Sequence, residues 1–254
     1  MKNTLIGLMV LATVLPACDQ QSPDTPEDRN LPRTWQYTTA EGDAKKDIDN
    51  GIRLEIALPP LNTTAPVPGL EDSLNAFAYK HPLTGEPLTA NALKSAVDSL
   101  YEDAKRENPE NDVVWFVTRE VNTLGRYQNT LSMAFHESSF MGGAHPNSFT
   151  IYKIFDVETG RRLSLSHLFS NEELKRCKTI AEQKFRTNRG MSDTSTYAYN
   201  GYWFSGNRFE LTDNAALTDS GVIFLYNPYD IGPYSMGAIE LEITFADIKS
   251  KTPL

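Results

Sequence analysis

Cysteine and long apolar runs are scarce in this chain of 254 residues. Its two cysteines, Cys18 and Cys177, are too few for a disulfide framework. The one extended apolar stretch, residues 5–14, has about ten residues, whereas a membrane-spanning helix needs roughly 20. The sequence therefore predicts neither a disulfide-stabilised scaffold nor a membrane-spanning helix.

Familiar catalytic motifs are also missing. There is no HExxH zinc motif, no Gly-x-Ser-x-Gly elbow, no phosphate-binding loop and no dinucleotide fingerprint. The nearest approach to a metal site is His136-Glu137 followed by His145, and strand alternation places the first two on opposite faces. We therefore expect no enzyme, no catalytic residue, no cofactor and no metal. A pair of carboxylates suited to a glycosidase stays open, because only their separation in space would reveal it.

Basic residues are in deficit. The 24 Lys and Arg residues face 33 Asp and Glu residues, which gives a formal net charge of −9. Because net charge governs long-range association, this balance argues against nucleic acid as a partner and favours a basic one.

The first 17 residues have the pattern of an export signal. Lys2 precedes the apolar run, and Leu15-Pro-Ala-Cys18 resembles a bacterial lipobox, in which the cysteine is acylated and becomes the mature N-terminus. We predict a lipoprotein signal peptide at residues 1–17, lipidation at Cys18 and a polar tether at residues 18–30. The alternative is an ordinary cleavable signal followed by an incidental cysteine.

These features predict an exported protein of the bacterial cell envelope, anchored by lipid to a membrane that faces the periplasm. Asp19, directly after the cysteine, resembles an inner-membrane retention signal. Because that rule varies between lineages, the choice between inner and outer membrane stays open.

Residues 31–254 alternate between strand-like and helix-like periodicity. Strands are predicted at residues 51–58, 112–124, 126–140, 148–157, 209–211, 221–226 and 239–245, and helices at 70–79, at 89–107 and from residue 171 onward. A tight turn near Gly125 is expected to join two of the strands. Ser170 and Glu173 have capping-box spacing, and Cys177 lies on the apolar face of the helix that follows, as a small buried hydrophobe rather than a reactive thiol.

The predicted fold class is α+β, because strands outnumber helices and most are joined as hairpins. We expect an antiparallel sheet packed by two or three helices, arranged as two small, closely packed subdomains.

Two turn-rich segments are candidate binding sites. In Phe140-Met-Gly-Gly-Ala-His-Pro-Asn147, the paired glycines permit close backbone approach and Pro146 restricts the residue before it. In Asn227-Pro-Tyr-Asp-Ile-Gly-Pro-Tyr234, two tyrosines offer large contact areas with polar tips. The alternatives are a structural corner with His145 packed locally, and tyrosines that plug the end of the core. The candidate partner-binding residues are Gly142, Gly143, His145, Pro146, Asn147, Pro228, Tyr229, Asp230, Pro233 and Tyr234.

A second candidate surface lies in the Ser-, Thr-, Tyr-, Asn- and Gly-rich residues 188–207, which are expected to form a long irregular excursion. Its tyrosine and tryptophan residues are Tyr197, Tyr199, Tyr202 and Trp203.

The two turn-rich segments carry a family resemblance. Together with Phe155-Asp-Val-Glu-Thr-Gly160 and Leu163-Ser-Leu-Ser-His-Leu-Phe169 between them, they resemble the RsiV-like domain, named for an anti-sigma factor whose extracellular part binds lysozyme. The resemblance assigns residues 140–254 to an RsiV-like C-terminal subdomain. Residues 31–139 resemble, through their layout, the small domain found in front of the catalytic domain of the PdaC-type peptidoglycan deacetylase.

The resemblance implies the recognition part of both relatives without their outputs. The anti-sigma factor has a cytoplasmic segment and a membrane helix ahead of its sensing domain, whereas this chain begins with an export signal, and no metal-dependent deacetylase domain follows. We therefore expect a cell-envelope binding module that recognises or inhibits lysozyme-type muramidases. The alternative partner is a peptidoglycan fragment or another envelope glycan, and the least favoured alternative is a glycan-active hydrolase.

Overall fold

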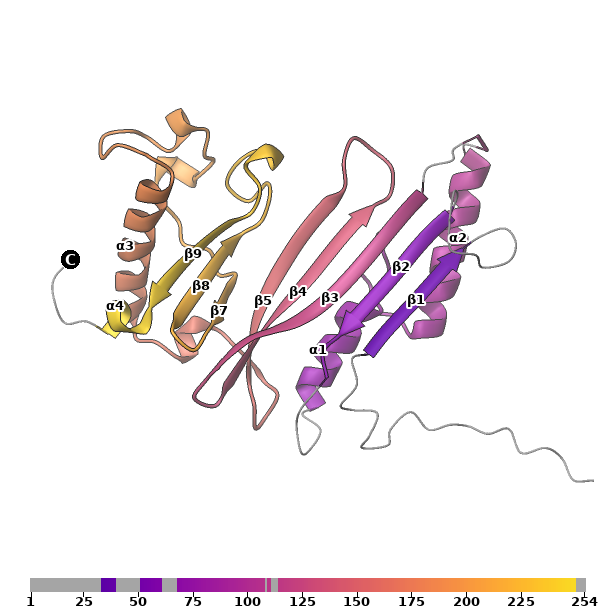
Figure 1. Cartoon of the computed structure of the whole chain (residues 1–254), viewed down its shortest axis with the longest axis horizontal. Coiled ribbons are helices and arrows are strands. Elements are labelled where there is room, and N and C mark those ends of the chain that lie inside the picture. The colour runs from indigo at the N-terminus through magenta and orange to yellow at the C-terminus, as the bar shows by residue number, and fades with distance from the viewer. Residues whose placement is uncertain (1–32, 40–50, 61–67, 108, 111–113, 250–254) are drawn as a thin grey trace, which may run out of the picture.

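The computed structural model describes residues 33–39, 51–60, 68–107, 109–110 and 114–249. The predicted signal peptide, Cys18 and the tether lie outside these residues. Within them, no helix is both long and apolar enough to cross a bilayer. The strands of the described chain form a six-stranded sheet and a three-stranded sheet, with helices on both, which confirms the predicted α+β class (Figure 1).

The first sheet has the strand order β1-β2-β3-β4-β5-β6. Its strands are β1 (Arg33–Thr39), β2 (Gly51–Leu58), β3 (Val114–Tyr127), β4 (Thr130–Phe140), β5 (Asn147–Asp156) and β6 (Arg162–Leu163). Neighbouring strands are antiparallel except β2 and β3, which run parallel. A parallel pair needs a long crossover, and here the chain between them forms the helices α1 (Pro68–Ala78) and α2 (Ala90–Glu107).

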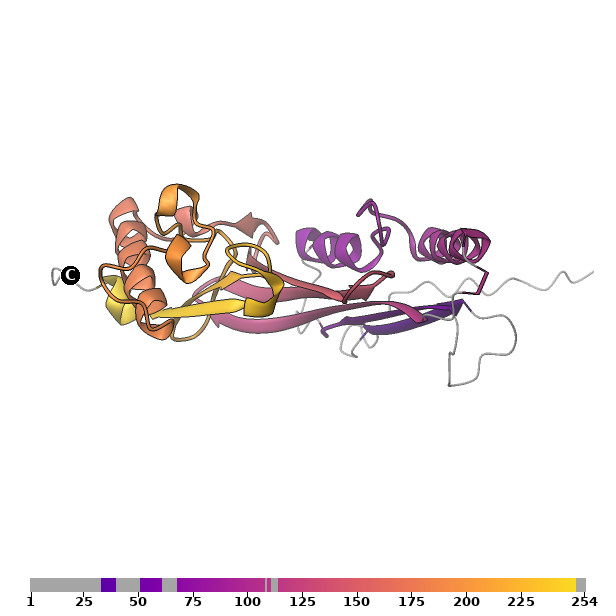
Figure 2. The same ribbon diagram turned by 90° about the horizontal axis from the view of Figure 1, so that it is seen from above.

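Both crossover helices lie over one face of this sheet (Figure 2). Alternation along β2 turns Ile52, Leu54, Ile56 and Leu58 toward them, and all four side chains are buried. The helices bury side chains at helical spacing against these strands: Leu70, Leu74, Phe77, Leu93, Val97 and Tyr101. The patterns that predicted these elements therefore match the observed core.

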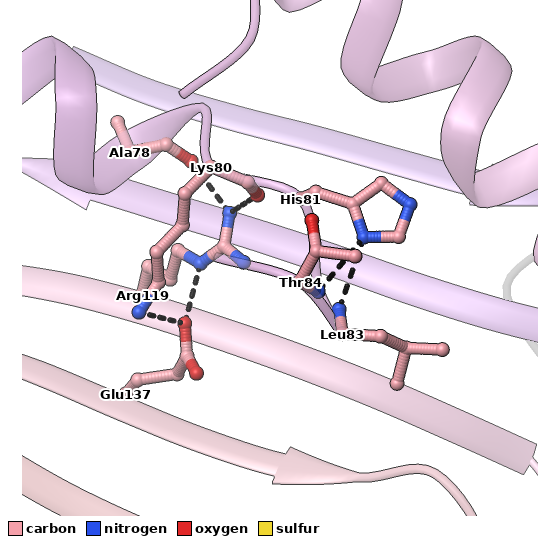
Figure 3. A network of polar contacts seen from close by, with 7 residues as sticks. All are labelled: Ala78, Lys80, His81, Leu83, Thr84, Arg119 and Glu137. Atoms are coloured by element: carbon pink, nitrogen blue, oxygen red, sulfur yellow. Dashed lines mark hydrogen bonds and ion pairs between the residues drawn. The ribbon is translucent and has the colours of Figure 1, made fainter. Parts of the chain in front are cut away.

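A buried ion-pair cluster joins the chain after α1 to β3 and β4 (Figure 3). Arg119 is fully buried, and its Nε donates to Glu137 Oε2 at 2.7 Å. Its Nη1 donates to the carbonyls of Ala78 and Lys80 at 2.9 and 2.7 Å. Lys80 Nζ lies 3.1 Å from the same Glu137 oxygen. The cluster holds the end of α1 against the sheet.

The predicted tight turn at Gly125 is wrong. β3 continues through Gly125 to Tyr127, and the hairpin turns at Gln128 and Asn129, where Gln128 has a φ of 51°. Gly125 lies instead at a bulge in β3. A Cβ there would lie 3.0 Å from the Cα of Thr218, directly after a strand of the second sheet, so the glycine permits close backbone approach rather than a turn.

The second sheet is antiparallel, with the order β7-β8-β9. Its strands are β7 (Ala215–Leu217), β8 (Gly221–Tyr226) and β9 (Ile239–Thr244), and the helices beside it are α3 (Asn171–Asn188) and α4 (Phe245–Lys249). The predicted capping box is confirmed: Ser170 N donates to the Glu173 carboxylate at 2.8 Å, and Glu173 N donates to Ser170 Oγ at 3.3 Å. Cys177 is fully buried, and burial raises the pKa of its thiol to about 11.

The short strand β7 was not predicted, and the strand expected at residues 209–211 is absent from the described structure. Phe209 packs into the core from irregular chain instead. Neither three-residue segment shows an alternation long enough to identify a strand, so the choice between them depends on contacts with distant residues.

The two sheets pack against each other through Ala134 and Tyr152 on the first and Ala216 and Leu225 on the second. Leu217 N also donates to Ser132 Oγ at 2.8 Å, in a buried hydrogen bond between the sheets. The predicted subdomain boundary after residue 139 falls at the end of β4, so strands from both sides of it belong to the first sheet.

Candidate functional site

Two loops lie at the same edge of the molecule (Figure 1). The corner, residues 141–146, joins β4 to β5, and the tyrosine loop, residues 227–238, joins β8 to β9. Together they form what we call the corner–loop site. All ten predicted partner-binding residues lie in these loops or at Asn147, the first residue of β5.

Two asparagine side chains, one at the start of the tyrosine loop and one just before β7, bond to the backbone of β5, the strand that follows the corner. Thr150 N donates to Asn227 Oδ1 at 2.7 Å, and Asn227 Nδ2 donates back to the Thr150 carbonyl at 3.0 Å. The Asn214 side chain bonds the next part of β5 in the same way. It accepts from Tyr152 N at 2.7 Å and donates to the same Thr150 carbonyl at 2.8 Å. These amides satisfy backbone groups of β5 that β6 does not reach, since β6 pairs only with residues 154 and 155.

Within the tyrosine loop, Asn227 and Asp230 close a tight turn. Asn227 N donates to Asp230 Oδ2 at 2.7 Å, and Asp230 N donates to the Asn227 carbonyl at 3.1 Å. Tyr229, inside the turn, has a φ of 74° and leaves 52% of its surface exposed. That backbone region is unfavourable for a bulky side chain. Ile231, directly after the turn, is buried and anchors the loop to the core.

His145 connects the corner to the tyrosine loop. Its ring stacks on Tyr234 with centroids 4.0 Å apart, and its Nε2 lies 3.1 Å from the Tyr229 hydroxyl. Its Nδ1 lies 2.8 Å from the Pro146 carbonyl. Because a carbonyl can only accept, Nδ1 carries a proton, and when the ring is neutral Nε2 accepts from the Tyr229 hydroxyl.

The other predicted residues shape the two loops. Gly142 and Gly143 have φ values of 87° and 108°, so both need the conformational freedom of glycine. A Cβ on Gly142 would lie 3.7 Å from the Trp115 ring, which the corner covers. Pro228 and Pro233 are half-buried within the tyrosine loop, and Pro233 directly precedes the short 3₁₀ turn of residues 234–236.

The second candidate surface divides into buried and exposed rings. Tyr197 and Tyr202 pack around Phe185 with centroids 6.0 and 4.8 Å from its ring, so the prediction that they form a surface is wrong. Phe185 lies on the apolar face of α3, and the irregular chain beside this face covers it. Tyr197 and Tyr202 are buried because they form part of that cover. Tyr199 and Trp203 remain 86% and 57% exposed.

The excursion that carries these rings lies beside the tyrosine loop. Trp203 N donates to the Ile231 carbonyl at 2.9 Å. The side chain of Met236 fills the space between the two segments, 2.5 Å from where a Cβ on Gly232 would lie and 3.1 Å from one on Gly201. Exposed aromatic rings of both segments therefore belong to neighbouring loops.

Sequence reasoning missed the role of Asn214 and Asn227. Asn227 lies in the recognised Asn-Pro-Tyr segment, which was a usable signal. Asn214 has no local signal, because its partners lie more than 60 residues away.

The histidine pattern does not assemble a metal site. His136 Nδ1 lies 2.9 Å from Thr150 Oγ1, whereas Glu137 turns to the opposite face of β4 and pairs with Arg119. In the part of the chain that the structure describes, no group of three or more His, Cys, Asp or Glu residues could hold a metal ion.

Comparisons with known proteins support the fold. Residues 166–246 match the model of the family described as a protein of unknown function, DUF3298. A DUF3298 family member from Bacteroides fragilis NCTC 9343 is similar in structure over 85% of this chain and 92% of that chain, with a TM-score of 0.60 and 21% identity. A DUF3298 family protein from Pseudomonas aeruginosa PAO1 is similar over 86% and 91%, with a TM-score of 0.61 and 17% identity.

The comparison with curated proteins gave no match. At identities of 21% and 17%, the structural similarities show a shared fold and nothing about ligands. The chain thus contains a segment similar to DUF3298 and has the fold of two solved members of that family.

Proposed function

We propose that this chain is a binding protein of the bacterial cell envelope, held at a membrane by lipidated Cys18, whose corner–loop site recognises and inhibits a lysozyme-type muramidase. It acts by binding and carries no catalytic residue of its own. The observation that supports this proposal most directly is the geometry of Tyr229.

An exposed tyrosine at positive φ is costly to the folded state. Non-glycine residues held in sparsely populated backbone regions cost about 1–3 kcal/mol each. The Tyr229 ring recovers little of this by burial, because it is 52% exposed and its hydrogen bond to His145 is also exposed. Glycine would avoid the strain. A ring presented outward at such a cost fits a contact residue, since tyrosine supplies large, rigid contact area at interfaces.

Charge and family resemblance point to the class of partner. The net charge of −9 favours a basic protein and speeds its encounter with the chain. The segments that form the corner–loop site resemble the RsiV-like domain, which is named for a protein that binds lysozyme. A basic muramidase of the lysozyme type is therefore the partner that we propose.

Calorimetry of the full chain with a basic lysozyme, at low and at physiological salt, tests the proposal. We expect binding that persists at physiological salt and lowers muramidase activity. Binding that disappears with salt would show charge attraction alone and would contradict the proposal, because exposed charges are largely screened beyond about 8 Å at that ionic strength.

The variant Tyr229→Gly separates binding from folding. It removes the ring and relieves the backbone, so we expect affinity to fall at least about 30-fold, as for an interface hot spot of 2 kcal/mol, while thermal stability is kept. Leu83→Ala is the matched control, because Leu83 is also exposed, at 62%, but lies in the loop between α1 and α2. Equal losses for both variants, or none for Tyr229→Gly, would place the contact elsewhere.

Peptidoglycan is the second candidate partner. It is favoured by the exposed rings of Tyr199 and Trp203, because aromatic rings with a polar tip suit the faces of sugars. Sedimentation with purified peptidoglycan tests it: Trp203→Ala should reduce retention and Leu83→Ala should not. Release of soluble sugar from the same material would instead support the hydrolase alternative.

A further inference from the structure

An open surface cavity of about 420 Å³, lined mainly by polar residues, lies between α3 and the irregular chain of residues 191–209, outside the corner–loop site. Pockets that bind small molecules are commonly about 300–1,000 Å³. Three cations and two carboxylates line the cavity, together with a tyrosine and an amide: Lys178, Arg186, Arg208, Glu182, Asp193, Tyr197 and Asn207.

One wall of the cavity is a row along α3. Lys178, Glu182 and Arg186 follow one another at intervals of four residues, so they share one face of the helix. Arg186 is committed to the fold, because its Nη2 donates to the carbonyls of Ser192 and Ser195 at 2.6 and 2.8 Å. These bonds hold residues 192–195 against α3. The helix wall of the cavity and the chain opposite it are therefore fixed relative to each other.

Two cations at the cavity lack a carboxylate partner. Among the ion pairs of the described residues, none includes Lys178 or Arg208. Arg208 packs its guanidinium over Gly206, with Nε and Nη2 3.6 Å from where a Cβ would lie. Positive charge is therefore available here in a protein whose net charge is −9.

The cavity also offers hydrogen-bonding groups that suit hydroxyls. Tyr197 donates to Glu182 Oε1 at 2.6 Å, which leaves the second carboxylate oxygen of Glu182 available to accept. Burial, together with this bond, raises the pKa of Tyr197 to about 12, so its hydroxyl stays protonated. Asn207 Oδ1 accepts from Ala198 N at 2.9 Å, which leaves the Asn207 amide N–H groups free to donate.

We propose that this cavity binds a small acidic sugar, whose carboxylate meets Arg208 and Lys178 and whose hydroxyls meet Glu182 and Asn207. The carboxylates at the cavity, Glu182 and Asp193, decide between this ligand and an inorganic anion. They repel a bare phosphate or sulfate, whereas a carboxylate accepts hydrogen bonds from sugar hydroxyls. A neutral sugar would leave both cations without a partner. The proposal does not depend on lysozyme binding at the corner–loop site.

Two matched pairs of sugars test the proposal on the full chain by ¹⁵N NMR titration at physiological salt. The probes are N-acetylmuramic acid with N-acetylglucosamine, and glucuronic acid with glucose. Charge-assisted hydrogen bonds contribute more than neutral ones, so we expect at least one acid to bind about tenfold more tightly than its neutral counterpart. The shifted amide signals should be those of the cavity residues.

Three variants locate the site. Arg208→Gln and Lys178→Gln should each weaken binding of the acid about tenfold and leave the neutral sugar unaffected. Lys175→Gln is the control, because Lys175 is an exposed cation on the same helix that pairs with Glu172 and lies outside the cavity. All three side chains are exposed, so unchanged amide spectra can verify the fold. Neither acid binding better than its neutral counterpart, or an equal loss for Lys175→Gln, would overturn the proposal.

Discussion

Replacing Glu137 with glutamine should destabilise this protein far more than the same change at the surface. Glu137 Oε2 accepts from the fully buried Arg119 at 2.7 Å and lies 3.1 Å from Lys80 Nζ. The variant Glu137→Gln keeps the size of the side chain but removes its charge. Two cations then remain near each other with no anion between them, and desolvation already lowers the pKa of Arg119.

The expected cost follows from how far each cation can move. Losing one partner of a buried pair typically costs about 3–5 kcal/mol. Arg119 cannot turn to water, because the carbonyls of Ala78 and Lys80 hold its Nη1 (Figure 3). The Lys80 side chain is 18% exposed and can relax outward. We therefore expect a loss near the lower end, about 3 kcal/mol.

An exposed pair provides the matched control. Glu172 Oε1 lies 3.0 Å from Lys175 Nζ, nearly the same distance, but the two side chains are 83% and 75% exposed. Such pairs contribute about 0–1 kcal/mol, so Glu172→Gln should change stability by no more than that. The two variants share the chemical change and differ in burial.

Urea unfolding followed by far-UV circular dichroism measures both variants against the unchanged chain. We expect the Glu137→Gln midpoint to fall strongly and the difference to persist in 1 M salt, since buried pairs are poorly screened. A cost below about 1 kcal/mol, or a cost equal to that of Glu172→Gln, would refute the reasoning that burial and the fixed position of Arg119 determine the penalty.

Three further predictions concern the second sheet and α3. Gly221→Ala should cost about 3 kcal/mol or more by thermal unfolding, because the added Cβ would lie 2.1 Å from the Ile243 carbonyl of the neighbouring strand. Phe185→Ala should cost about 3–5 kcal/mol in urea unfolding, since its ring is fully buried among other aromatic rings. Glu173→Gln should lower stability at neutral pH, with a difference that shrinks on acidification, because hydrogen bonds from the Ser170 backbone and hydroxyl hold the pKa of Glu173 below its usual 4.5.

The sign of the Glu173 effect follows from linkage. A carboxyl whose pKa is lower in the folded state adds stability above its unfolded pKa, and this stability is lost as pH falls through the folded pKa. A difference that stays constant from pH 7 to pH 3 would contradict the assignment.

Gly143→Ala is the control for Gly221→Ala, because no atom lies within 4 Å of the added Cβ, although its φ of 108° still makes the substitution unfavourable.

The sequence alone determined the elements whose signals are local. The period-two alternation of residues 51–58 and the capping box at Ser170 predicted β2 and the start of α3 because these patterns involve neighbours within four residues. The two turn-rich segments were also recognisable, since glycine and proline have direct backbone consequences. Lipidation at Cys18 and export remain predictions from the sequence, because they concern residues that the structure does not describe.

Only the tertiary structure decided how distant segments meet. It brought His145 onto Tyr234, drew Tyr197 and Tyr202 into the core around Phe185, and used Gly125 for contact between sheets rather than for a turn. The physical reason is that the local sequence around a tyrosine does not show whether its ring lies on the surface or in the core. Nor does the sequence around a glycine show whether it forms a turn or permits a close backbone contact. Which of these it does depends on the partners that the fold places opposite it, and those partners lie tens of residues away.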